Sequence, residues 1–241
     1  MNDKTVGIVI KENDAKENDV ILTVYTKDFG KLSFYAKGLK KSTSKNAYAC
    51  QMFDYSEFLL DYNDARDIQI LKSASLKNEF VNIKGDYEKL GLASVMVEII
   101  DKIAEDDMYD FLYAALDLLD RSQEMYTVFN IFLAQILKYV GLQPMVDGCV
   151  ICGNTQNIET ISLNDGGFVC HDCNSTLNIK KRDVAFLRNF RIINKASFEV
   201  YDKLTGQGFD DYNLAELLME FLIMHSGLRV RSWRSVTSLH N

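Results

Sequence analysis

The first third of the chain alternates apolar and polar residues with the period of two that predicts β-strands. The most regular alternation is DVILTVYTK at 19–27, and KLSFYAK at 31–37 follows it across a turn that contains Gly30. These two stretches predict a hairpin. Strands are expected over residues 5–10, 19–27, 31–37, 48–62 and 66–73. Five short strands favour a small closed barrel, of which the OB-fold is the common five-stranded form.

From about residue 76 onward the apolar residues recur at helical spacing. Helices are expected over residues 86–105, 109–119, 126–142, 183–190 and 213–224. The stretch 126–142 is apolar on most of its faces, so it should be a central helix. Gly141 and Pro144, the only proline, mark its end.

The change of period predicts an α+β protein of several domains. An N-terminal OB-fold-like β-barrel should precede an all-α helical domain, with a four-cysteine segment inserted in the helical part. The expected boundaries are 1–78 for the barrel, 79–144 and 177–241 for the two parts of the helical domain, and 145–176 for the cysteine segment.

The two faces of the predicted hairpin differ in chemistry. Leu32, Phe34 and Ala36 share the face expected to form the core. The opposite face, expected to be exposed, carries Tyr25, Lys27, Lys31, Ser33, Tyr35 and Lys37. Tyrosines between lysines suit single-stranded nucleic acid, because rings stack on bases and ammonium groups neutralise phosphates. Tyrosine is also common on exposed strands for its β propensity alone, so both interpretations stay open.

The net charge of −7 argues against nucleic-acid binding only if the charge is spread evenly, and it is not. Residues 86–124 hold eleven acids and three bases, whereas 37–45 hold four lysines and no acid. Six bases and one acid lie in 180–195, including Arg188 and Arg191, and the tail from Gly227 has three arginines and no acid. The alternative is that these basic runs are solvated surfaces.

Two CxxC pairs provide the most specific chemical signal. Cys149-Val-Ile-Cys152-Gly153 and Cys170-His-Asp-Cys173 are separated by 17 residues, a spacing typical of a four-cysteine zinc site. Four thiolates close the zinc coordination shell, so the metal should be structural. Gly166-Gly167 should turn a hairpin that brings the second pair back. His171 could replace Cys170 as a ligand, although it more simply lies outside the shell.

Disulfides and redox chemistry are weaker alternatives for these cysteines. A disulfide framework is typical of small secreted chains, and this sequence shows no signal-peptide pattern. A redox CxxC needs a nearby βαβ pattern, which is absent. The odd cysteine, Cys50, should be a reduced, partly buried thiol. Cytoplasmic localisation follows as the expectation, and no apolar run is long enough to span a membrane.

No catalytic constellation stands out, since GxSxG, P-loop and GxGxxG motifs are all missing. Asp106 and Asp107 could bind a divalent cation, but an acidic helix surface explains them more simply. The residues by themselves thus give no sign of a catalytic site.

The order of these parts resembles the bacterial RecO family of recombination mediators over essentially the full chain. The most specific segments are Ala36-Lys37-Gly38-Leu39-Lys40-Lys41 and 141–153, which contains Leu142-Gln-Pro144 and the first CxxC pair. The tail Leu228-Arg229-Val-Arg231-Ser232 is also similar. The resemblance implies an N-terminal OB-fold, a helical domain and, in many members, a zinc-binding insert. The strongly acidic 86–124 stretch departs from it and makes a DNA path across that region doubtful.

The resemblance also implies a function. Such proteins bind single- and double-stranded DNA, anneal complementary strands, and work with RecR and single-stranded DNA-binding protein to load RecA, in the nucleoid. They are not enzymes, and we expect the same of this protein. The residues expected to contact DNA are Tyr25, Lys27, Lys31, Tyr35, Lys37, Lys40, Lys41, Lys45, Arg188 and Arg191. The acidic tail of single-stranded DNA-binding protein should bind to the basic residues of 180–195 or to the C-terminal arginines. Alternatives are a zinc-stapled protein–protein adaptor without direct DNA binding and, more weakly, a hydrolase.

Overall fold

The computed structural model describes residues 2–103 and 108–240. The chain forms two compact units, one of residues 1–121 together with 232–241, the other of residues 122–231. The finer four-part division that the sequence suggests stays a prediction. Among the described residues, no helix has both the length and the apolar character needed to cross a membrane.

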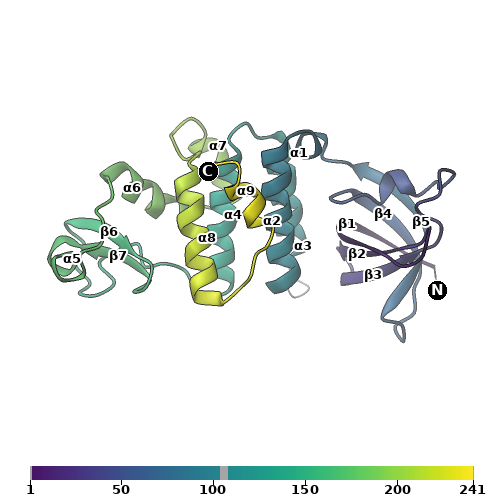
Figure 1. Ribbon diagram of the computed structural model, residues 1–241, viewed down its shortest axis with the longest axis horizontal. Coiled ribbons are helices and arrows are strands. Elements are labelled where there is room, and N and C mark those ends of the chain that lie inside the picture. Colours follow the sequence, from purple (N-terminus) through teal and green to yellow (C-terminus); the bar gives the residue numbers. More distant parts are fainter. Residues whose placement is uncertain (1, 104–107, 241) are drawn as a thin grey trace. The chain divides into compact units, whose positions relative to one another are not determined.

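The first unit begins with a closed five-stranded barrel (Figure 1). Its strands are β1 (Asn2–Asp14), β2 (Val20–Thr26), β3 (Gly30–Ala36), β4 (Tyr55–Asp61) and β5 (Ile68–Asn78). Neighbours follow the order β1-β2-β3-β5-β4, and only β3 and β5 pair in parallel among these strands. The structure thus confirms the OB-like barrel that the alternation predicts.

The barrel core follows the parity of the predicted hairpin. Leu22 pairs with Phe34 across β2 and β3, and both side chains are fully buried. Phe34 also meets Phe58 of β4 edge to face, with ring centroids 5.2 Å apart. Such aromatic pairs add to the burial that holds a small barrel together.

The expectation that Tyr25 lies on an exposed face is wrong. Its side chain is only 1% exposed, and its hydroxyl accepts a hydrogen bond of 3.1 Å from the backbone N–H of Met108. Val24, Tyr25 and Thr26 are all buried, so the end of β2 is covered on both sides. A period of two separates the faces of a strand, but it does not say which of them a later segment covers.

The helices of the first unit are α1 (Val81–Gly85), α2 (Tyr87–Ile103), α3 (Tyr109–Arg121) and α9 (Trp233–Thr237). The two longer ones confirm the helical spacing, whereas the short α1 and α9 were not predicted. A five-residue helix is too short to show a periodic apolar face.

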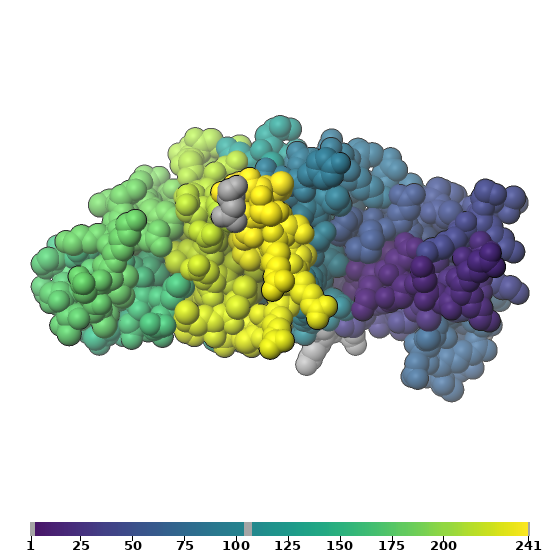
Figure 2. All heavy atoms as spheres, in the orientation of Figure 1, coloured from purple at the N-terminus to yellow at the C-terminus, as the bar shows by residue number. Residues whose placement is uncertain are grey.

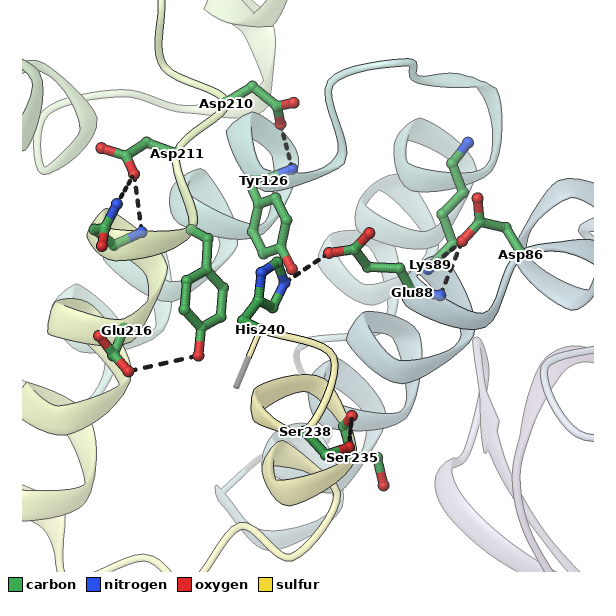
Figure 3. Close-up of polar contacts among 12 residues, drawn as sticks. Asp86, Glu88, Lys89, Tyr126, Asp210, Asp211, Glu216, Ser235, Ser238 and His240 are labelled. Carbon is green, nitrogen blue, oxygen red and sulfur yellow. Dashed lines mark hydrogen bonds and ion pairs between the residues drawn. The ribbon is translucent and has the colours of Figure 1, made fainter.

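The C-terminal segment 232–240 packs on α2 and runs over the outside of the molecule on the face drawn in Figure 2. The N–H and Oγ of Ser232 donate to Glu98 at 2.8 and 2.6 Å. His240 Nε2 lies 2.8 Å from Glu88 Oε1 (Figure 3). Gly91 leaves room for Val236, because a Cβ there would lie 3.0 Å from its Cγ2. These contacts fix the end of the chain to the first unit.

The second unit is built around α4 (Met125–Tyr139), which is buried on nearly every face and packs along α8 (Tyr212–Ser226). Its remaining described elements are β6 (Ile158–Ser162), β7 (Gly167–Cys170), α5 (His171–Leu177), α6 (Val184–Ile193), a 3-10 helix (Phe198–Val200) and α7 (Tyr201–Leu204). Asp210 accepts a hydrogen bond of 2.6 Å from Tyr126 N at the start of α4 (Figure 3). The predicted central helix is therefore confirmed.

Candidate metal centre and nucleic-acid interface

The four cysteines of the two CxxC motifs converge in the second unit. Cys149 and Cys152 lie on a turn, Cys170 ends β7 and Cys173 lies in α5. Their four Sγ atoms all lie within 4.8 Å of one another, and Cys152 and Cys170 are 3.6 Å apart. A tetrahedral metal with bonds of about 2.3 Å places its sulfur ligands about 3.8 Å apart. The cluster can therefore hold one metal ion.

The local backbone explains why the first pair faces inward. Gly153 N–H donates to the Cys149 carbonyl at 2.8 Å, and Cys149 N–H donates to the Asn154 carbonyl at 2.8 Å. Gly153 has φ of +75°, a left-handed conformation that glycine adopts without steric penalty. The turn between β6 and β7, which includes Gly166 as expected, brings the second pair to the first.

The alternatives for the cysteines do not fit this geometry. All five cysteines are free thiols, and 3.6 Å is far beyond the S–S bond length of about 2.0 Å. His171 lies outside the cluster: its side chain is 63% exposed, and its Nδ1 is 2.6 Å from Glu159 Oε2. Cys50 is buried in the barrel, and burial raises its pKa to about 12.

The backbone around Cys149 favours the thiolate form that a metal requires. Burial acts to raise the pKa of this thiol, but backbone N–H groups of Cys170, Cys152 and Ile151 point at the sulfur and outweigh burial, so the pKa falls to about 6. The pKa of Cys173 is instead raised, first by its hydrogen bond with the Cys152 sulfur and then by burial. Binding of a cation between the four sulfur atoms therefore stabilises this cluster.

The predicted DNA-contacting residues differ in whether their charge is already neutralised. Lys40 forms an ion pair with Asp14. Lys31 lies 3.1 Å from the carboxylate of Asp101 and 2.8 Å from its carbonyl. In the part of the chain that the structure describes, Lys27, Lys37, Lys41 and Lys45 are exposed and have no carboxylate partner. Three of these four ammonium groups lie in residues 37–45, whereas Lys27 lies at the other end of the hairpin, in the turn between β2 and β3.

The two predicted arginines belong to the second unit, and they too differ in whether a carboxylate already neutralises their charge. Arg191 donates to the Val146 carbonyl at 3.1 Å and to Asp147 at 2.8 Å. Arg188 is exposed, and no carboxylate of the described ranges contacts it. The structure therefore leaves Arg188 as the more available of these two charges.

Residues 37–45 form consecutive turns between β3 and a short 3-10 helix (Ala47–Ala49), as expected for a loop. Tyr35, just before them, is half-buried, and its hydroxyl donates to Asp19. The rings of Tyr25 and Tyr35 were both predicted to stack on bases. The ring of Tyr35 remains on the outer face of the barrel, in contrast to that of Tyr25.

Two isoleucines beside Tyr35 were missed by sequence reasoning. Tyr35 pairs with Ile70 and Ser33 with Ile68 across the parallel β3–β5 ladder, and these isoleucines are 40% and 41% exposed. Between them Gln69 is buried, with its amide bonded to the loop carbonyls of Asn63 and Arg66. An Ile-Gln-Ile pattern normally indicates that the isoleucines are core, so no sequence signal revealed this apolar outer face.

The acidic residues proposed as an alternative cation site, Asp106 and Asp107, lie outside the described residues. Asp101, in the same acidic stretch, is described and accepts from Lys31.

Comparison with known proteins covers both halves of the chain. Residues 1–80 match the family described as "Recombination protein O N terminal" and residues 84–233 match "Recombination protein O C terminal". Relatives named "DNA repair protein RecO" include that of Caldanaerobacter subterraneus, 27% identical over 95% of both chains, and that of Alkaliphilus metalliredigens, 26% identical over 92% of this chain and 93% of the relative.

A third relative of the same name, from Desulforamulus reducens, is 35% identical over 70% of this chain and 68% of its own. The family matches extend over the barrel, the helices and the cysteine segment described above. The chain therefore belongs to the RecO family of DNA repair proteins.

Proposed function

We propose that this protein binds single- and double-stranded DNA through the outer face of its barrel and anneals complementary strands. The observation that carries the proposal is the juxtaposition of Tyr35 and Ile70 with the unpaired lysines that follow in 37–45. Aromatic and apolar side chains can stack on bases while the ammonium groups neutralise phosphates. The contacts come from two paired strands, β3 and β5, and from the loop that continues β3.

Annealing follows from charge neutralisation. Two strands that are held on one neutralised surface repel each other less, and pairing then proceeds by base complementarity. This mechanism requires no side chain to break a bond, so we propose that the protein is not an enzyme. Within the family context, it would act with RecR to load RecA on strands coated by single-stranded DNA-binding protein.

We further propose that the four cysteines hold one zinc ion. Four sulfur donors at tetrahedral spacing suit zinc, and they leave no open position for a substrate. Zinc bound here would staple the Cys149 turn to β7 and α5. Its contribution is therefore to the folding of the segment 145–176.

We also propose that the second unit receives the acidic tail of single-stranded DNA-binding protein. A hollow of about 320 Å³ is lined by the apolar side chains of Ile161, Leu217 and Met224 and by the basic residues Lys180 and Arg182, among others. Cations that line a hollow attract an acidic peptide by charge complementarity. Both basic residues belong to the 180–195 stretch from which the receptor was expected.

The test is a titration of labelled single-stranded and double-stranded oligonucleotides at several salt concentrations, followed by an annealing assay with complementary strands. We expect binding that weakens steeply with salt and annealing that weakens in parallel. A protein that binds neither DNA but does bind the tail peptide would instead be the adaptor, and turnover of DNA would indicate a hydrolase.

A further inference from the structure

One carboxylate contacts residues 37–45, which we call the basic loop. Asp19, the residue before β2, uses both of its oxygens: Oδ1 accepts from the backbone N–H of Gly38 at 2.7 Å, and Oδ2 accepts from the Tyr35 hydroxyl. The same two hydrogen bonds hold the pKa of Asp19 below its ordinary value, with the Tyr35 bond as the larger cause. Asp19 is therefore ionised at neutral pH.

The bonds of Asp19 join the end of β3 to the start of the basic loop. Gly38 has φ of +65°, and the next turn closes when Lys41 N–H donates to the Gly38 carbonyl at 3.2 Å. The residue before Asp19 takes part as well, since the Asn18 carbonyl accepts from Lys40 N–H at 3.1 Å. The loop between β1 and β2 thus fixes residues 37–41 in one conformation.

An acid in this place opposes DNA binding through its charge. A carboxylate beside phosphates repels them, and removing it should by itself strengthen binding. Any favourable effect of Asp19 on binding must therefore come from the conformation that its hydrogen bonds impose. The two effects have opposite signs, so substitution separates them.

We propose that Asp19 is a positioning residue for the nucleic-acid interface: it fixes Gly38 and the Tyr35 ring so that the unpaired lysines and the stacking face are presented together. The inference rests on the proposed DNA binding. A loop already held in its binding conformation loses less conformational entropy on binding than a free one.

The test compares four variants with the wild-type chain by anisotropy of a labelled single-stranded oligonucleotide. Asp19→Ala removes both hydrogen bonds and the charge, and we expect it to bind about fivefold more weakly than Glu17→Ala, which loses a charge alone; this factor is the effect of losing a backbone-capping side chain worth about 1 kcal/mol. Asp19→Asn keeps an acceptor for Gly38 N–H and a polar group for Tyr35, so its binding should equal or exceed that of wild type. Glu17→Ala is the matched control.

Glu17 lies two residues away on the same turn, is exposed, and makes no hydrogen bond or ion pair among the described residues. Its removal should leave affinity unchanged or raise it by up to about threefold, since only a repulsive charge is lost. Tyr35→Phe removes one of the two hydrogen bonds but keeps the ring, so it should weaken binding less than Asp19→Ala does.

Hydrogen exchange of the DNA-free proteins gives a readout that does not depend on binding. The backbone amides of 37–41 should exchange faster in Asp19→Ala than in wild type or Glu17→Ala, while those of the barrel strands stay protected. A wild-type chain that binds no DNA would overturn the proposed function. If wild type binds but Asp19→Ala binds as tightly as Glu17→Ala, or if exchange in 37–41 is unchanged, the positioning role is refuted and the DNA proposal stands.

Discussion

Replacing the three unpaired lysines of the basic loop should change how DNA binding depends on salt. Lys37, Lys41 and Lys45 are exposed and have no carboxylate partner in the described structure, so each can release a counterion when it meets a phosphate. Each contact with a single strand contributes about 0.7 to the slope of log affinity against log salt, so the three contribute about 2.1. Over a fourfold rise in salt this amounts to a roughly twentyfold change in affinity.

We therefore expect the triple alanine variant to lose affinity at low salt and to approach the wild-type affinity as salt rises. The assay is an anisotropy titration of a labelled single strand across that salt range. Annealing should fall with binding. The free energy of unfolding should change by no more than about 0.5 kcal/mol per site, because exposed lysines contribute little to folding.

A double variant at Lys138 and Lys203 provides the matched control. Both lysines are exposed, neither has a carboxylate partner in the described ranges, and both belong to helices of the second unit rather than to the barrel that carries the proposed interface. This control should keep the wild-type slope. If the triple variant keeps the wild-type slope as well, the loop is a solvated surface and the DNA path lies elsewhere.

Three further predictions concern other parts of the molecule. Cys152→Ser should abolish stoichiometric metal content and speed hydrogen exchange in 145–176 while the barrel stays protected; zinc-free wild-type protein purified without chelator would contradict this. Tyr25→Phe should lower the free energy of unfolding by about 1 to 3 kcal/mol, because Met108 N–H loses a buried acceptor, and should leave the salt slope of DNA binding unchanged. Burial raises the pKa of Asp54 above its ordinary value of 3.8, despite the opposing effect of Lys84. The native state therefore keeps this proton up to a higher pH than the unfolded state does. The free energy of unfolding should fall as the pH rises from the ordinary pKa of Asp54 through its raised native value. Chemical unfolding of Asp54→Asn across the same pH range should lack this decline.

The sequence was informative wherever a local pattern decides the structure. Strand alternation predicted the barrel and the inward side chains of its hairpin, and CxxC spacing predicted the sulfur cluster, because both depend on residues close together in the chain. Tyr25 could not be placed in this way. Its burial depends on Met108, a residue 83 positions away, and no periodicity carries that information.

Ion pairing was equally hidden from the sequence. Lys31 lies in a run that looks like a basic surface, yet its partner Asp101 comes from the acidic stretch 70 residues later. Lys40 and Lys41 are adjacent and chemically identical, but only Lys40 reaches Asp14 across the neighbouring hairpin. Net charge within a segment is visible in the sequence, whereas neutralisation by a distant segment needs the fold.

Lys40 and Lys41 allow a paired and an unpaired lysine to be compared for their effect on DNA binding, in a protein of net charge −7. Exposed ion pairs are worth only about 0 to 1 kcal/mol, so a phosphate can displace Asp14 from Lys40. The freed carboxylate then takes up cations from solution and offsets those released by the DNA. Lys40→Ala should therefore lower affinity with little change in the salt slope, whereas Lys41→Ala should lower the slope by about 0.7. Equal slope changes in the two single variants would mean that the Lys40–Asp14 pair does not persist in solution, and Lys40 would then join the lysines whose charge is free for DNA.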